Sequence, residues 1–129
     1  MFELDRSSLV VRPRKPLIDW VNALSDEDGH KISVAEAQDN PEIFLIPEVE
    51  DEHGLALALA THHEEIFEHL LWSWVVDESL WPKERSVEML LSWCDVELAG
   101  TVFDLPEEPI HAYVDDEPDV SDESDESVN

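Results

Sequence analysis

Residues 52–75 read EHGLALALATHHEEIFEHLLWSWV and form the longest stretch of the chain with one regular pattern. Asp51 precedes this stretch and is a suitable N-cap, and Gly54 lies near the start, where a glycine costs least. The apolar residues recur at the spacing of one helix face: Leu55, Leu59, Ile66, Phe67, Leu70, Leu71 and Trp74. We predict one long amphipathic helix over residues 52–75, packed through this face on a core.

Three shorter runs have the character of strands. Leu9-Val10-Val11 is rich in β-branched residues and ends at Arg12-Pro13, which predicts a strand at or near a sheet edge because proline cannot donate to a ladder. Residues 43–46, IFLI, are apolar on both alternating faces, which predicts a central strand buried on both sides. Val96, Leu98 and Val102 alternate with polar residues, which predicts a half-buried third strand.

Helices are expected between these strands. Pro16 suits the first turn of a helix that continues through Leu17, Val21 and Leu24. Residues 33–36, SVAE, have capping-box spacing, so a short helix should begin there and stop at Asn40-Pro41. A last helix should begin at Trp81-Pro82, with a core face made by Val87, Leu90, Leu91 and Cys94.

The predicted element order is strand, helix, helix, strand, helix, helix, strand. This order indicates an α+β fold in which a sheet of about three strands packs against helices. Strand order and strand direction stay open, because paired helices between strands permit parallel or antiparallel neighbours.

The chain divides at Leu105. Its 129 residues suffice for one domain with one core, and we assign residues 1–105 to a single α/β-type domain with a loop at residues 25–29. Residues 106–129 hold ten Asp or Glu and no Lys or Arg. Such a segment buries too little apolar surface to offset its ordering entropy, so we predict a disordered acidic tail.

The formal net charge of -26 restricts the partners of the protein. Residues 1–105 alone hold 23 acidic and 7 basic residues, so the acidity is not confined to the tail. Such a surface repels nucleic-acid phosphates and anionic lipids, and it attracts basic proteins. Solubility, adaptation to high internal salt and a functional charge pattern are three open explanations for the acidity.

The segment at the N-terminus and the single cysteine indicate a cytoplasmic protein. Residues 1–5, MFELD, are acidic where a secretory signal would be basic, and no apolar stretch approaches the length of a membrane span. Cys94 has no second cysteine in the chain to pair with, which fits a reducing compartment.

No catalytic signature is present in the sequence. It contains no G-x-S-x-G, no C-x-x-C and only three glycines, too few for a phosphate-cradling loop. Carboxylates are so abundant that no pair stands out as acid and base. Cys94 lacks an electropositive setting, so it is expected to be a small hydrophobic core residue. We assign no catalytic residue and no cofactor, and we expect a non-enzymatic protein.

The histidine-rich part of the long helix is the weak alternative. His62, Glu65 and His69 lie at helical spacing and could hold a metal, which would suit a small metal-binding protein or enzyme. The spacing is not that of a zinc protease or a di-iron bundle, and Glu-His pairs one turn apart are common on a solvated helix face.

Two groups of residues are candidates for contact with a partner. Arg12, Arg14 and Lys15 could clamp a carboxylate, or they could neutralise the protein's own carboxylates and guard an edge strand. Trp72 and Trp81 could form an exposed aromatic surface, or they could belong to a large aromatic core under residues 77–82.

Three segments carry a resemblance: RPRKPLIDW at 12–20, LIPE at 45–48 and DESLWP at 77–82. Through them the chain resembles a group of small acidic bacterial proteins of unknown function over residues 8–105. The resemblance implies a bacterial cytoplasmic protein with a compact α/β-type domain. It implies no activity, cofactor or site residue.

These observations favour an interaction or regulatory protein that binds a basic protein partner. One alternative is a nucleic-acid mimic, which occupies a DNA- or RNA-binding protein and requires a continuous acidic stripe. The other alternative is the metal-binding protein or enzyme built on His62, Glu65 and His69. The partner's identity and the oligomeric state stay open.

Overall fold

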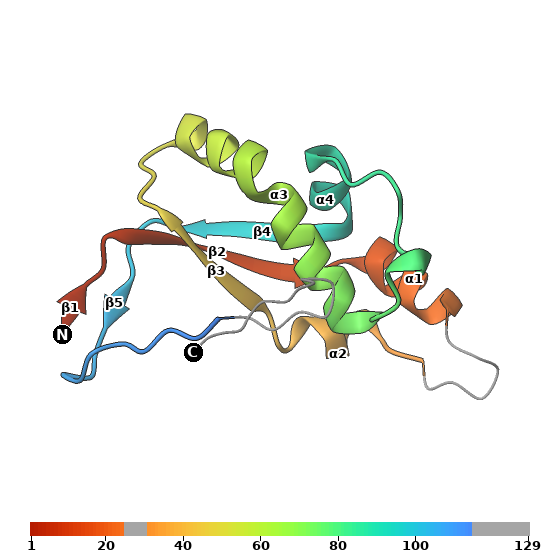
Figure 1. The fold of residues 1–129 in the computed structure, drawn as a ribbon, viewed down its shortest axis with the longest axis horizontal. Helices are drawn as coiled ribbons and strands as arrows, with labels where there is room; N and C mark the ends of the chain where they lie inside the picture. Colours follow the sequence, from red (N-terminus) through yellow and green to blue (C-terminus); the bar gives the residue numbers. More distant parts are fainter. Residues whose placement is uncertain (25–30, 115–129) are drawn as a thin grey trace.

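The computed structural model describes residues 1–24 and 31–114 (Figure 1). It is an α+β fold with a small antiparallel sheet. Its helices and strands are, in chain order, β1 Phe2–Glu3, β2 Arg6–Pro13, α1 Lys15–Leu24, α2 Val34–Gln38, β3 Glu42–Pro47, α3 Glu52–Trp74, the 3-10 turn η1 Glu78–Leu80, α4 Val87–Trp93, β4 Cys94–Ala99 and β5 Phe103–Asp104.

The three main strands lie in the order β3-β2-β4, and both neighbours of β2 are antiparallel to it. The long helix α3 crosses this sheet, while α1 and α2 gather beyond the end of β2 (Figure 1). The short strands β1 and β5 pair separately. Among the described residues, no helix is long and apolar enough to cross a membrane.

The predicted places of the first two strands were wrong. β2, predicted at or near a sheet edge, is the central strand, and its Leu9 and Val11 are fully buried. β3, predicted as central, is an edge strand that leaves Ile43 61% and Leu45 51% exposed. Pro13 is tolerated because it is the last residue of β2, so its missing donor does not interrupt the ladder.

The core lies between α3 and one face of the sheet. α3 ends one residue before the predicted limit and buries Ala58, Leu59, Ile66, Phe67, Leu70 and Leu71. On the sheet, Leu9, Val11 and Ile46 belong to the same cluster. Burial of each large apolar side chain contributes about 1.5–3 kcal/mol, so this face is the main source of stability.

The two helices before β3 form near their predicted places. The capping box is confirmed, because Ser33 Oγ accepts a hydrogen bond from Glu36 N and the Glu36 carboxylate accepts one from Ser33 N. α1 buries Leu17, Ile18 and Val21.

The last helix begins later than predicted. Asp77 caps the turn η1, and α4 starts only at Val87, where Ser86 Oγ accepts a hydrogen bond from Met89 N. Trp81 is 6% exposed, and its indole Nε1 donates to the Val75 carbonyl oxygen over 2.7 Å. The buried indole therefore holds the segment around Pro82 as a loop, where a helix had been predicted.

Cys94 is a strand residue and not a helix residue. α4 ends at Trp93, whose carbonyl accepts a hydrogen bond from Arg14 N, and Cys94 pairs with Pro13 in the sheet. Leu90 is buried, but Leu91, predicted in the core, is 40% exposed. β4 ends at Ala99, before the predicted Val102, and β5 follows as a separate strand.

Two other predictions concern segments that the structure does not describe or describes only in part. The predicted loop at residues 25–29 lies outside the described residues, as do residues 115–129 of the predicted tail. Residues 106–114 of that tail carry no helix or strand.

Candidate functional site

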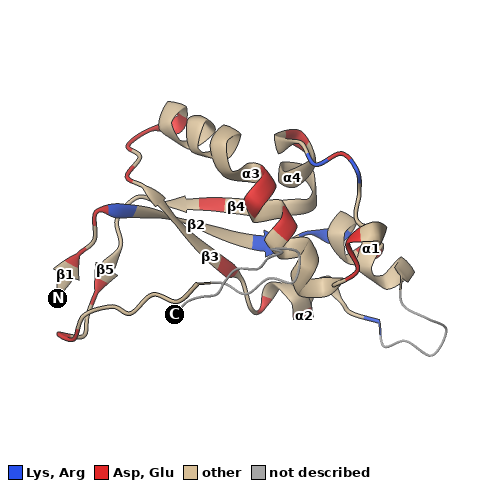
Figure 2. Cartoon of the chain, in the orientation of Figure 1, with Lys and Arg blue, Asp and Glu red and all other residues tan. Residues whose placement is uncertain are grey.

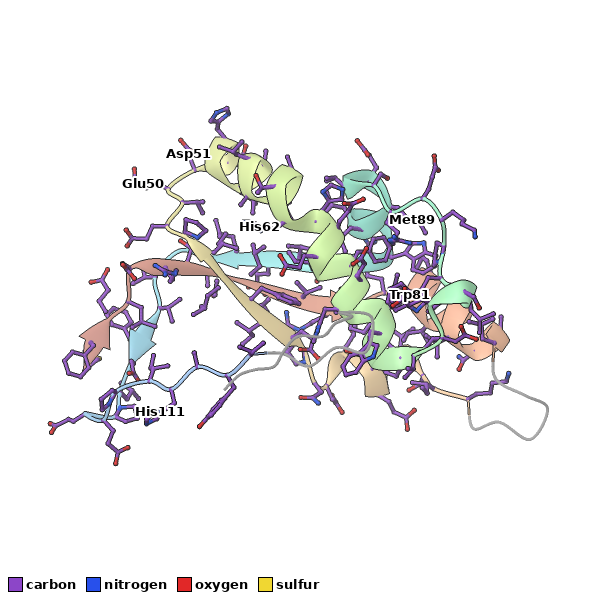
Figure 3. All side chains as sticks on the ribbon, in the orientation of Figure 1. Glu50, Asp51, His62, Trp81, Met89 and His111 are labelled. Atoms are coloured by element: carbon purple, nitrogen blue, oxygen red, sulfur yellow. The ribbon has the colours of Figure 1, made fainter. Side chains whose placement is uncertain are left out.

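A cavity of about 460 Å³ lies where the chain leaves β3 and enters α3. We call it the α3 cavity. Figure 3 labels Glu50 and Asp51 at the start of α3 and His62 further along the same helix. The lining comprises Pro47, Glu48, Val49, Glu50, Asp51, Gly54, Leu57, Ala58, Thr61 and His62.

A buried serine holds the loop side of the α3 cavity. Ser7, in β2, is fully buried, and its Oγ accepts a hydrogen bond from Val49 N over 3.0 Å. The same hydroxyl donates to the Gly100 carbonyl oxygen over 3.0 Å. One side chain thus ties the loop after β3 to the end of β4, and both backbone groups gain a partner.

The helix side of the cavity depends on a capping residue. Asp51 Oδ1 accepts a hydrogen bond from Gly54 N over 2.9 Å, which caps α3. The Asp51 carboxylate also lies at the positive end of the helix dipole. Glu48 and Glu50 are exposed beside it, so the described residues that line the cavity include three carboxylates and no Lys or Arg.

The cavity also has an apolar side. Two of its lining residues are apolar side chains of α3: Ala58 is buried, whereas Leu57 is 63% exposed. The Thr61 hydroxyl donates to the Leu57 carbonyl oxygen within the helix. The arrangement offers anionic oxygen acceptors next to apolar surface, which suits a group that combines a positive charge with an apolar stem.

A second cavity, of about 280 Å³, lies between α2, β3 and the end of α3. Its lining combines carboxylates with one indole: Val11, Pro13, Glu36, Ala37, Asn40, Glu42, Leu70, Ser73 and Trp74. The Ser73 hydroxyl donates to the His69 carbonyl oxygen, so it is already engaged within α3.

The predicted metal ligands are not brought together. His62 Nδ1 lies 3.9 Å from Glu65 Oε1, on the exposed side of α3. His69 faces the sheet, with Nε2 3.5 Å from Glu42 Oε1 and its ring edge-on to Phe44. Within the described parts of the chain, no group of three His, Cys, Asp or Glu side chains is placed to hold a metal ion.

The basic candidates lie together at the end of β2 and the start of α1, where Figure 2 shows Lys and Arg in blue. Each makes a bond within the chain: Arg12 Nη1 to Glu97 Oε1 at 3.1 Å, Arg14 Nη1 to the Leu91 carbonyl oxygen at 3.1 Å, and Lys15 Nζ to Asp19 Oδ2 at 2.9 Å. Their role in partner binding stays a prediction.

The two tryptophan candidates occupy different environments. Trp81 belongs to the core cluster, as described above. Trp72 is half-buried beside His69, with the two ring centroids 6.2 Å apart, and its buried Nε1 has no hydrogen-bond partner among the residues that the structure describes. A contact of Trp72 and Trp81 with a partner also stays a prediction.

Sequence reasoning missed the α3 cavity. Its signal was present in two features, three carboxylates within the four residues 48–51 and Leu57, which lies off the predicted core face of α3. Neither feature by itself indicates a cavity. The loop after β3 contacts β2 through Ser7, and this tertiary contact cannot be inferred from the spacing of apolar residues in the sequence.

Cys94 is chemically quiet at neutral pH. Burial raises the pKa of its thiol from 9.0 to about 12, and the nearby Arg14 charge lowers it by less. A thiol that stays protonated is a poor nucleophile and a poor metal ligand.

No protein-family model, curated protein or solved structure matches this chain.

Proposed function

We propose that this chain is an acidic interaction protein that binds a basic protein partner. The observation that carries the proposal is the position of the carboxylates. Residues 1–105 hold 23 Asp and Glu against 7 Lys and Arg. In the described parts of the chain, the buried polar residues are Ser7 and Ser8, so no Asp or Glu is buried there. The carboxylates of the described residues therefore remain accessible to solvent.

The protein's own cations do not cancel this excess. Within residues 1–24 and 31–114, four of them pair with a carboxylate: Arg6 with Asp5, Arg12 with Glu97, Lys15 with Asp19 and Arg85 with Glu68. Arg14 and Lys31 bond to backbone carbonyls. Seven cations can neutralise at most seven of the 23 carboxylates, which leaves a charge of -16 on residues 1–105.

A surface of this kind speeds association with a positively charged partner and makes binding sensitive to salt. Single exposed ion pairs contribute only about 0–1 kcal/mol each. Specific recognition therefore needs a defined contact in addition to the general field. Cys94, the single cysteine of the chain, is buried and unpaired, which suits the reducing cytoplasm. We therefore propose that the interaction takes place in the cytoplasm.

Binding of a basic protein is better supported than imitation of nucleic acid. Mimicry requires carboxylates in a continuous stripe at phosphate spacing. Figure 2 shows acidic residues spread over α3, β3, β4, β5 and several loops. This distribution suits a general anionic surface more than a copy of one phosphate backbone.

The test is affinity capture from cell lysate with the immobilised full chain at low salt, followed by elution with salt. A captured basic protein is identified, purified and titrated against the full chain by calorimetry at about 50 mM and about 500 mM salt. We expect direct binding that weakens strongly with salt. The proposal fails if no basic protein binds directly, or if its affinity does not change with salt.

A full-length variant with every Asp and Glu of residues 106–129 changed to Asn and Gln locates the contact. Unchanged affinity for the purified partner assigns binding to residues 1–105. Lost affinity assigns it to the acidic tail.

A further inference from the structure

We propose that the α3 cavity receives an arginine or lysine side chain from an extended basic segment of the partner, and that an apolar neighbour of that residue packs on Leu57. The inference rests on the proposed function and names the place where the partner binds. It draws on three properties of the cavity, which are its shape, its charge and its exposed apolar surface.

The shape is that of a ligand site. A volume of about 460 Å³ lies within the usual range of ligand pockets, about 300–1,000 Å³. The cavity is formed by a loop on one side and by residues 54–62 of α3 on the other. A side chain can therefore enter between two segments of the chain, where a flat acidic surface would offer no such place.

The charge selects a cation. Three of the ten lining residues are carboxylates, and no lining residue is Lys or Arg. Asp51 is engaged as the cap of α3, so Glu48 and Glu50 are the acceptors for an incoming group. A guanidinium offers five donors in a planar fork that matches carboxylates, and an ammonium offers three. The carboxylates are not arranged to hold a metal ion, since no such group of three occurs in the described residues.

The apolar surface selects a protein segment over a small cation. Leu57 lies between Leu55 and Leu59, which pack against or within the core, yet it is itself 63% exposed. The fold makes little use of this side chain. Arginine and lysine bury apolar stems next to their charges, and a neighbouring apolar residue would cover Leu57.

The cavity is held in place before any partner arrives. Ser7 fixes the backbone of Val49, and a Cβ at Gly54 would lie 3.1 Å from Val49 Cβ, so loop and helix are in direct contact. A preformed site loses less conformational entropy on binding.

The probe is the blocked decapeptide Ac-GRLGRLGRLG-NH2, titrated into the isotope-labelled full chain at low salt and followed by two-dimensional NMR. We expect the largest shift changes at Val49, Glu50, Gly54, Leu57 and Thr61. A peptide with Gln in place of Arg should not bind, and one with Ser in place of Leu should bind more weakly.

Two double variants with the same loss of charge test the location. E48Q/E50Q removes the proposed acceptors, whereas E84Q/E88Q removes two exposed carboxylates outside the cavity lining. We expect about tenfold weaker peptide binding for E48Q/E50Q, which corresponds to about 1.4 kcal/mol, and less than about a twofold loss for E84Q/E88Q. The variant L57S should also bind more weakly. Thermal unfolding of each variant verifies that it is folded.

Equal losses for the two double variants would mean that the peptide follows the general field, which would overturn the cavity proposal and leave a basic partner in place. Failure of the peptide to bind the wild-type chain, while a captured basic protein does bind it, would have the same meaning. Failure of both the peptide and every basic protein would overturn the proposed function itself.

Discussion

Gly54 and Val49 are in such close contact that a Cβ at position 54 would lie 3.1 Å from the Val49 Cβ and 3.3 Å from its Cγ1. The loop that follows β3 therefore rests directly on the backbone of α3. A side chain at position 54 can enter this contact only if Val49 moves.

Substitutions at Gly54 should show opposing effects of helix propensity and crowding. Alanine favours a helix by up to about 1 kcal/mol over glycine, but Val49 must yield by a few tenths of an ångström, so Gly54→Ala should change stability by less than about 1 kcal/mol. Gly54→Val adds two more methyl groups than Gly54→Ala does and should lower the free energy of unfolding by about 1–3 kcal/mol. Equilibrium unfolding in urea measures both.

Ala56→Val is the matched control, because Ala56 is exposed in the same helix. It should cost less than about 1 kcal/mol, the range of intrinsic helix propensity. Equal losses for Gly54→Val and Ala56→Val would contradict a tight contact at Gly54.

Ser7 should contribute more to stability than its size suggests. Ser7→Ala removes the acceptor of Val49 N and the donor to the Gly100 carbonyl, so two backbone groups lose a partner. Both bonds are part-buried, so each lost bond should cost about 0.5–1.5 kcal/mol. Ser8→Ala, on the opposite face of β2, is the control, and urea unfolding of both variants gives the comparison. A smaller loss for Ser7→Ala than for Ser8→Ala would show that the Ser7 bonds contribute little.

Sequence patterns predicted the parts of this fold that local chemistry determines. The apolar spacing from Leu59 to Leu71 predicted α3 to within one residue, and Ser33 with Glu36 marked the start of α2. The apolar face and the capping box are local properties of a helix. They can be recognised in the sequence without knowing which residues pack against that helix.

The sequence patterns gave wrong predictions where tertiary packing determines whether a residue is buried. Ile43 and Leu45 are as apolar as a buried strand, but a three-stranded sheet covered by α3 on one face does not bury them. The hydrogen bond that Trp81 Nε1 donates to the Val75 carbonyl oxygen spans a turn, and the one that Val49 N donates to Ser7 Oγ spans 42 residues of chain. The contact between Ser7 and Val49 holds the loop side of the α3 cavity, so the site could not be predicted although its carboxylates were visible.

The position of β3 at the sheet edge can be tested by paired substitutions. Ile43→Thr should change the free energy of unfolding by no more than about 0.5 kcal/mol, because the side chain is 61% exposed. Ile46→Ala on the same strand should cost about 2–5 kcal/mol, because Ile46 lies in the core. Thermal or urea unfolding distinguishes the two, and similar losses would mean that both faces of β3 are covered.

Cys94 predicts a loss of stability at high pH. Its pKa is about 12 in the folded chain against 9.0 for an ordinary thiol, so the folded state keeps a proton that the unfolded state releases. The stabilisation is complete below pH 9 and is lost between pH 9 and 12, at about 1.4 kcal/mol per pH unit.

The measurement is urea unfolding under reducing conditions across this range, for the wild-type chain and for Cys94→Ala. As the pH rises from 9 to 12, the unfolding free energy of the wild-type chain should fall relative to that of Cys94→Ala. A difference that stays constant would show that the thiol titrates normally. At neutral pH, Cys94 should react with an alkylating reagent only after unfolding.

The acidic residues on the outer strands β3 and β4 also affect how two copies of the protein could meet. β3 and β4 both end the sheet, and an open strand is a template on which another chain can add. β3 carries Glu42 and finishes in Pro47, while β4 carries Asp95 and Glu97. Two copies that met along these edges would bring like charges together. The carboxylates proposed to attract a cationic partner would thus also oppose growth of the sheet from one molecule to the next.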